Sequence, residues 1–260
     1  MRLPWILGLA IAFGVGQRQR GEAPPLPVPV LVELFTAEGC SSCPPADVLL
    51  EKMLTQQPAA GAWLVGLGEH VDYWNQGGWK DRFSAAAFTR RQQLYAARSG
   101  SDNVYTPEMV VDGDAGFVGT DIDAARRAIE RAEHVPHGTI RIALGHESQS
   151  KDAITVMVEI RELPDTDGGN PLDLLVAITE DGLRTDVKSG ENHGRTLTHA
   201  AVVREMVTVA SVPTTDSSQR ATLRFNGEWR RHASRLVAFV QQRRSRRVLA
   251  TSAVPLAEDR

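Results

Sequence analysis

The sequence has few cysteines and no excess of either charge. Two cysteines in 260 residues are too few for a small fold held together by several disulfides. Lysine and arginine number 29 against 32 aspartates and glutamates, a net charge of −3, so nucleic-acid binding is not indicated. Hydrophobic residues make up 42% of the chain, which excludes a disordered protein. The length suits one large domain or two small ones.

Several signatures of catalysis are missing as well. The sequence contains no G-x-S-x-G, P-loop, dinucleotide fingerprint or H-E-x-x-H motif. Only one C-x-x-C is present, which excludes a four-cysteine zinc site. We therefore expect no bound cofactor.

The N-terminus has the pattern of a signal peptide. Arg2 precedes an apolar run that ends near Val15 and is shorter than the roughly 20 residues of a membrane span. We expect a signal peptide over residues 1–20 and a proline-rich linker over 21–27; an uncleaved membrane anchor is the alternative. Export predicts a periplasmic or secreted protein in an oxidising compartment, where a disulfide persists.

Residues 28–136 alternate strand and helix patterns. Val28 to Phe35 is an apolar run typical of a buried parallel strand. Pro44 to Gln57 has helical spacing, with proline in the first turn, where a helix tolerates it. Further helices are predicted over 81–99 and 121–132, and further strands over 62–71, 107–112 and 117–118.

Residues 138–260 show strands, turns and little helix. Several strands alternate strictly, as at Val156, Val158 and Ile160. Short strands separated by turn clusters favour an antiparallel sandwich. The sequence thus predicts an α/β domain over 28–136 followed by an all-β sandwich-like domain over 138–260.

The two cysteines form one motif, FTAEGCSSCPPAD, between a predicted strand and a predicted helix. The two-residue gap lets the sulfurs of Cys40 and Cys43 meet, and a helix N-terminus favours the thiolate that disulfide exchange needs. Proline disfavours a helical conformation at the residue before it, so we expect the helix to begin at Pro44.

These features resemble the thioredoxin superfamily over residues 28–136. The resemblance rests on the strand from Val30 to Phe35, the Cys40-x-x-Cys43 motif and Thr106-Pro107 before a strand. CSSCPPAD, HVDYWN, YTPEMVVDG and GENHGRTLTHAAVVR together also resemble a bacterial secreted family known only as a domain of unknown function. The resemblance implies an α/β thioredoxin-like domain over 28–136.

The resemblance also implies roles for individual residues. In thioredoxins a cis-proline faces the cysteines and binds an extended peptide, so Pro107 is predicted cis, with Thr106 beside it. A buried acid in the preceding strand moves a proton to the second cysteine, a role that Glu33 fits. Trp74, in a segment longer than plain thioredoxins have, either binds a partner or closes onto the core.

Two other interpretations remain open. Some thioredoxin-like copper carriers use a cysteine pair with a histidine, so Cys40, Cys43 and His70 form an alternative copper or zinc site. The pair is otherwise a structural disulfide in a non-catalytic envelope interaction protein. Asn192, His193 and His199 lie in a polar segment of the second domain, where the two histidines contact the first domain, bind a ligand or are solvated.

The function expected first is an exported thiol–disulfide oxidoreductase of unknown direction. Cys40 is the expected nucleophile and Cys43 the resolving thiol. Partners would be protein thiols or disulfides and a membrane redox protein, with no nucleic acid and with membrane contact only through an uncleaved N-terminus.

Overall fold

The computed structural model describes residues 26–145, 152–165 and 169–256. The predicted signal peptide and most of the predicted linker lie outside the described residues. Within these ranges, no helix is both long and apolar enough to cross a membrane.

The first segment, residues 28–136, follows the predicted alternation of strands and helices. Asp121 caps the third helix, as its side chain accepts a hydrogen bond from Ala124 N at 2.8 Å. The second helix begins at Ala86, not at the predicted Asp81, because the Asp81 side chain is bonded within its own loop. The elements are β1 (Val28–Thr36), α1 (Pro44–Gln56), β2 (Ala62–His70), the 3₁₀ helix η1 (Tyr73–Gln76), α2 (Ala86–Arg98), β3 (Glu108–Val111), β4 (Phe117–Val118) and α3 (Ile122–Ala132).

The second segment, from residue 138 onward, consists mainly of strands. The predicted alternation is confirmed, since Val156, Val158 and Ile160 are fully buried while Met157 is exposed. The elements are β5 (Thr139–Leu144), β6 (Ala153–Arg161), β7 (Leu172–Glu180), β8 (Leu183–Asp186), β9 (Thr196–His199), β10 (Val202–Val212), β11 (Ser217–Arg224), the 3₁₀ helix η2 (Arg231–Ala233), β12 (Ser234–Gln242) and β13 (Val248–Pro255).

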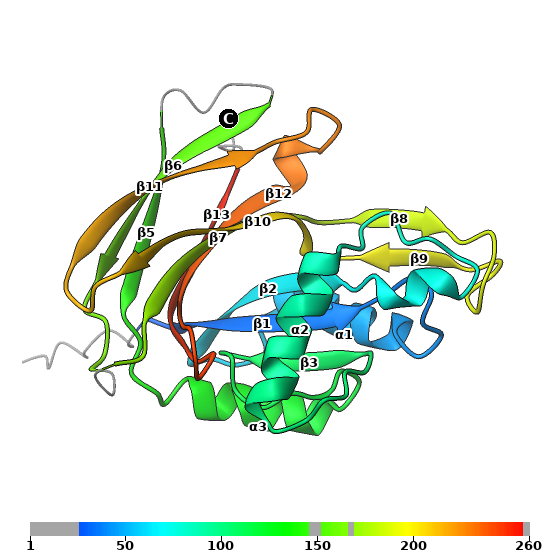
Figure 1. Cartoon of the computed structure of the whole chain (residues 1–260), viewed down its shortest axis with the longest axis horizontal. Helices are drawn as coiled ribbons and strands as arrows, with labels where there is room; N and C mark the ends of the chain where they lie inside the picture. The colour runs from blue at the N-terminus through cyan, green and yellow to red at the C-terminus, as the bar shows by residue number, and fades with distance from the viewer. Residues whose placement is uncertain (1–25, 146–151, 166–168, 257–260) are drawn as a thin grey trace, which may run out of the picture.

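One mixed sheet runs through both segments (Figure 1). Its eight strands follow the order β13-β12-β7-β10-β2-β1-β3-β4, and β10 meets β2 in parallel at Val202 and Gly68. The predicted fold class, an α/β thioredoxin-like domain followed by an all-β sandwich-like domain, is therefore wrong. The described residues are mostly β, with strands of both segments in one sheet and three α-helices. Local periodicity shows which face of a strand is buried but not which strand lies beside it. The domain boundary near residue 137 stays a prediction.

Helices and smaller sheets cover this central sheet. The apolar sides of α1 and α3 pack with β1 and β3 on one face, and Phe88 of α2 packs with Leu31 and Leu67 on the other. The three-stranded sheet β11-β6-β5 packs on β7 and β12. The β8–β9 hairpin extends beside α1 (Figure 1). This hairpin brings the second segment to the end of β1, where the cysteines lie.

Candidate functional site

The cysteine pair lies between the end of β1 and the start of α1. Cys40 and Cys43 form a disulfide with their Cα atoms 5.4 Å apart. Cys43 N donates to Cys40 O at 3.2 Å, and Ala46 N donates to Cys43 O at 2.8 Å. α1 begins at Pro44, as predicted. The disulfide is thus part of a tight turn that leads into the helix.

Both cysteines are completely buried, with 0% of their surface exposed. Phe35 and Tyr95 belong to the apolar cluster around them, and the partly buried Trp74 packs against it. A Cβ atom at Gly39 would come within 3.3 Å of the Trp74 Cβ atom, so glycine allows the tryptophan to approach the turn closely. The disulfide is therefore out of reach of a protein thiol in this conformation.

The predicted substrate-binding residues lie together beside the turn. The Thr106–Pro107 peptide bond is cis, which confirms that prediction. Ser42 Oγ donates to Thr106 O at 3.5 Å, and Trp74 Nε1 donates to Thr106 Oγ1 at 2.7 Å. Trp74 thus closes over the edge of the core next to the cysteines. The roles of Thr106, Pro107 and Trp74 in substrate binding stay predictions.

The predicted proton donor, Glu33, is buried and paired. Its Oε2 atom lies 2.6 Å from Arg91 Nε, and its Oε1 atom accepts a hydrogen bond from Tyr95. Burial raises the pKa of Glu33, but the charge and hydrogen bond of Arg91, with hydrogen bonds from Glu69 and Tyr95, together lower this pKa by more, so the net pKa lies below its ordinary value. Tyr95 links this carboxylate to the apolar cluster around the cysteines. The proton-transfer role stays a prediction.

His70, the predicted third metal ligand, is bonded elsewhere. Its Nδ1 atom lies 2.6 Å from Asp81 Oδ2, with both side chains buried. Burial raises the pKa of Asp81, and His70 lowers it by more, with help from the backbone N–H groups of Glu38 and Phe83. Among the described residues, no group of three or more His, Cys, Asp or Glu side chains is arranged to hold a metal ion.

The loop between β8 and β9, residues 187–195, reaches across to the cysteine turn. Asn192, which is completely buried, donates from Nδ2 to Glu38 O and to Cys40 O, both at 2.9 Å. Glu191 Oε2 accepts a hydrogen bond from Ser41 N at 3.0 Å. We call residues 187–195 the covering loop, because it ties the second segment to the turn.

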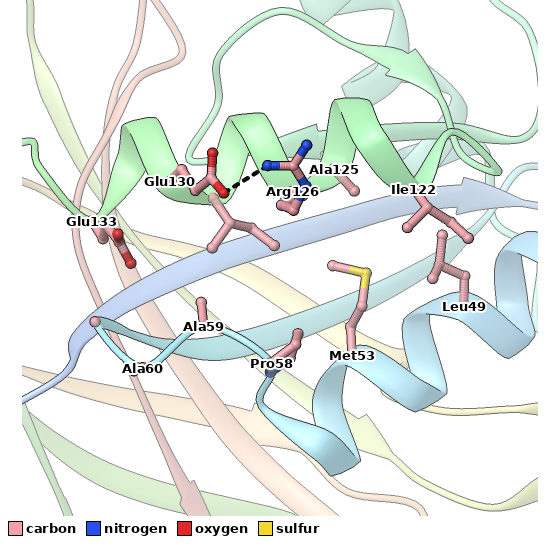
Figure 2. Close-up of a pocket in the computed structure, with 12 residues that line it drawn as sticks. Leu49, Met53, Pro58, Ala59, Ala60, Ile122, Ala125, Arg126, Glu130 and Glu133 are labelled. Atoms are coloured by element: carbon pink, nitrogen blue, oxygen red, sulfur yellow. Dashed lines mark hydrogen bonds and ion pairs between the residues drawn. The ribbon is translucent and has the colours of Figure 1, made fainter.

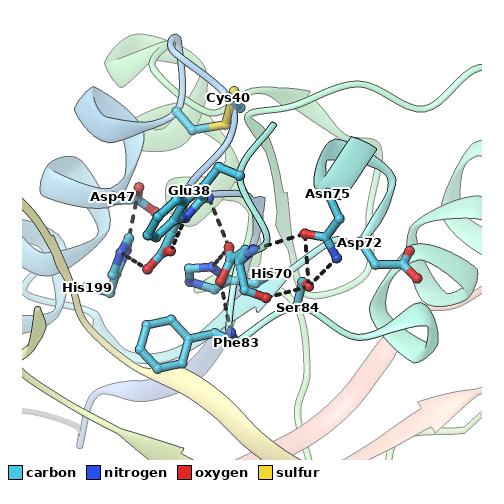
Figure 3. A network of polar contacts seen from close by, with 12 residues as sticks. Glu38, Cys40, Asp47, His70, Asp72, Asn75, Phe83, Ser84 and His199 are labelled. Carbon is cyan, nitrogen blue, oxygen red and sulfur yellow. Dashed lines mark hydrogen bonds and ion pairs between the residues drawn. A yellow bond between two sulfur atoms is a disulfide. The ribbon is translucent and has the colours of Figure 1, made fainter. Parts of the chain in front are cut away.

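A buried ionic group lies behind the disulfide (Figure 3). His199 Nε2 is 3.5 Å from Glu38 Oε1, and His199 Nδ1 is 3.7 Å from Asp47 Oδ2. The His199 ring also packs edge-on against the His70 ring, at 4.8 Å between centroids. We call these residues, with Asp81, the histidine cluster. The sequence predicts for His199 a contact with the first domain, a bound ligand or solvation, and it does not single out Glu38 or Asp47. The signal for the latter two was their position on either side of the C-x-x-C motif.

A separate apolar pocket of about 410 Å³ lies between α1 and α3 (Figure 2). Leu49 and Met53 line it from α1, and Ile122 and Ile129 from α3. Arg126 and Glu130 pair at its rim at 2.9 Å. None of the predicted site residues lines this pocket.

The fold and the site define a mixed-sheet protein with a buried disulfide at the carboxyl end of its central strands. The chain belongs to the family described as "Protein of unknown function (DUF1223)", whose model matches residues 31–241. The predicted membership in a family of unknown function is thereby confirmed. No curated protein matches the chain.

Two solved structures share the fold. Protein AGR_C_4864 from Agrobacterium tumefaciens is 24% identical, with a TM-score of 0.69, covering 91% of this chain and 98% of its own. HBP35 of Porphyromonas gingivalis is 15% identical, with a TM-score of 0.63, covering 89% of this chain and 76% of its own. At these identities the likeness concerns the fold and carries no function across.

Proposed function

We propose that this chain is a thiol–disulfide oxidoreductase that works outside the cytosol through Cys40 and Cys43. The observation that carries the proposal is the disulfide itself, which lies at the start of α1, where the intervening Ser42 donates to Thr106 O. The signal-peptide pattern and the disulfide support an oxidising location, since cytosolic thiols are kept reduced. The partners are protein dithiols or disulfides, a membrane redox protein among them.

The exchange proceeds in two steps. In the reduced protein the Cys40 thiolate attacks a partner disulfide, forms a mixed disulfide and releases one partner thiolate. Cys43 then attacks the Cys40 sulfur, which closes the Cys40–Cys43 bond and releases the second partner thiolate. Two electrons pass to the partner, and the reverse sequence oxidises a partner dithiol. The direction depends on the reduction potential.

Access to the sulfurs requires movement of the structure described above. Trp74 and the covering loop both shield the turn, and Asn192 holds it through two carbonyl groups. The covering loop is held to the first segment by a few side-chain hydrogen bonds, each of which contributes about 1 kcal/mol, and Val187 at its start is buried. The free energy needed to open the covering loop therefore lies within the range of local unfolding.

An insulin-reduction assay with glutathione equilibration tests the proposal. The wild-type protein should accelerate exchange, Cys40→Ser should abolish the acceleration, and Cys43→Ser should accumulate the mixed disulfide. Equal rates for wild type and Cys40→Ser would remove the support for a redox function.

The complete burial of both cysteines favours a second candidate, a non-catalytic envelope interaction protein with a structural disulfide. The two functions differ in reduction potential. A potential below about −300 mV, resistant to glutathione, is typical of a structural disulfide, and a higher potential favours the oxidoreductase.

A further inference from the structure

His199 brings a charge from the second segment to the cysteine site. Its side chain is 3% exposed, and the two carboxyl groups that it faces, Glu38 and Asp47, are 0% and 6% exposed. Each ring nitrogen lies closest to a different carboxylate, at 3.5 Å and 3.7 Å. The histidine is therefore placed between two acidic groups that come from different parts of the cysteine turn.

The surroundings of His199 favour its charged form. Burial lowers the pKa of His199, and Asp47 and Glu38 raise it by more, to about 9. His70, which faces the ring from β2, is itself bonded to Asp81. At neutral pH His199 is thus an imidazolium ion in a dry environment, where the charges of its neighbours are only weakly screened.

Both carboxyl groups sit on the backbone that flanks the disulfide. Asp47 lies one helical turn after Cys43, and its backbone N–H donates to Cys43 O at 3.2 Å. Glu38 lies two residues before Cys40, and its side chain accepts a hydrogen bond from Trp79 Nε1 at 2.7 Å. Figure 3 shows Glu38 and Asp47 on the side of the turn that faces His199. Both acids are buried and lie two and four residues along the chain from a cysteine.

We propose that His199 is a positioning residue of the cysteine pair, an inference that rests on the function proposed above. Its positive charge offsets Glu38 and Asp47 beside the sulfurs and thereby favours the reduced, thiolate-bearing form of Cys40–Cys43. A dithiol reduces the pair by transferring two electrons to the S–S bond, which breaks. The two cysteine sulfurs then share the two protons that the dithiol gives up. A nearby cation stabilises a thiolate and an anion destabilises it. A protein that stabilises its reduced form is the stronger oxidant.

The test is the equilibrium between the cysteine pair and dithiothreitol with its oxidised form, measured at pH 7 on the full chain. His199→Gln removes the cation, so the equilibrium constant for reduction of the pair should fall threefold to tenfold, a potential about 15 to 30 mV more negative. Asp47→Asn removes an anion and should raise the same constant. His193→Gln, an exposed histidine of the covering loop, is the matched control and should leave it unchanged.

Opposite changes in the equilibrium constant of His199→Gln and Asp47→Asn distinguish an effect of charge from structural damage. A disrupted site would change the constant in the same direction for both variants. Shifts of the same sign, or values equal to wild type, overturn the inference while the proposed function stands. Should His199→Gln fail to fold, Asp47→Asn and Glu38→Gln still decide, since both must raise the constant. A wild-type pair that does not exchange with dithiothreitol overturns the proposed function and this inference together.

Discussion

Two buried ionic groups join the two segments, and they are built differently. The arginine cluster is centred on Arg91, which lies 2.6 Å from Glu33 and donates to Gln241 and Tyr95 at 3.0 Å each. In the histidine cluster the two nearest contacts of His199 are 3.5 Å and 3.7 Å long. Neither ring nitrogen has a hydrogen-bond partner among the described residues.

The two groups differ in the length of their central contacts. Both nevertheless contain buried polar atoms without a hydrogen-bond partner in the described part of the chain, Glu69 Oε1 and Oε2 beside Arg91 and both ring nitrogens of His199. Arg91 reaches an acid of β1 and an amide of β12 with short hydrogen bonds, which tie a strand of the first segment to a strand of the second. The ring nitrogens of His199 meet their carboxylates only at ion-pair distance, without a short hydrogen bond, and a buried polar group without a hydrogen bond calls for an explanation such as a redox role. The arginine cluster should therefore contribute to stability alone, whereas the histidine cluster should contribute to stability in a pH-dependent way and also to the redox properties of the cysteine pair.

The largest expected effect is on the arginine cluster. Arg91→Met removes the partner of a buried Glu33 carboxylate, and breaking such a pair typically costs about 3 to 5 kcal/mol. Urea unfolding of wild type and variant measures the loss. The neighbouring exposed Arg90 provides the control, because Arg90→Met should change stability by less than about 0.5 kcal/mol. If Arg91→Met lowers the unfolding free energy by less than about 1 kcal/mol, the arginine cluster is not the structural tie that its short hydrogen bonds indicate.

The second prediction concerns the pH dependence of stability. The pKa of His199 is raised to about 9 in the folded protein, above about 6.5 in an unfolded chain. Because the folded state binds the proton more tightly, this stabilisation is fully present below about pH 6.5 and is lost as pH rises through about 9. The expected contribution is about 3 kcal/mol.

The measurement is the unfolding free energy of wild type minus that of His199→Gln, at pH 6 and pH 9.5. The difference should shrink at the higher pH, while groups common to both proteins cancel. His193→Gln is the control, and its difference in unfolding free energy from wild type should not change between pH 6 and pH 9.5. A difference for His199→Gln that stays constant with pH would mean that His199 is not held as a cation.

Some of these features follow from local sequence and others do not. Alternation placed Val156 and Val158 on the buried face, and the C-x-x-C motif located the disulfide, because these signals span only a few neighbouring residues. The fold class was wrong because the pairing of Val202 with Gly68 joins strands far apart in the chain. No periodicity encodes which strand a given strand will meet.

The candidate site divides in the same way. The C-x-x-C motif predicted that the sulfurs of Cys40 and Cys43 meet, and the family resemblance predicted the cis bond before Pro107; the structure contains both the disulfide and the cis bond, while the roles of these residues stay predictions. The contact of Asn192 with Cys40 O spans 152 positions of sequence, and the placement of His199 depends on how the β8–β9 hairpin packs on α1. Such long-range contacts are set by tertiary packing, which one sequence read locally does not reveal.

The smallest expected effect tests the cover over the disulfide. Asn192→Ala removes the donor to Glu38 O and Cys40 O, which should weaken closure of the covering loop by about 1 to 2 kcal/mol. The rate at which dithiothreitol reduces the disulfide should therefore rise severalfold and at most about thirtyfold, since 1.4 kcal/mol corresponds to a factor of ten. Asn226→Ala, at an exposed turn away from the cysteines, controls for loss of an asparagine and should leave the rate unchanged. An unchanged rate for Asn192→Ala would mean that the reductant reaches the sulfurs past Trp74. Access to the disulfide would then be controlled by the first segment and not by the covering loop.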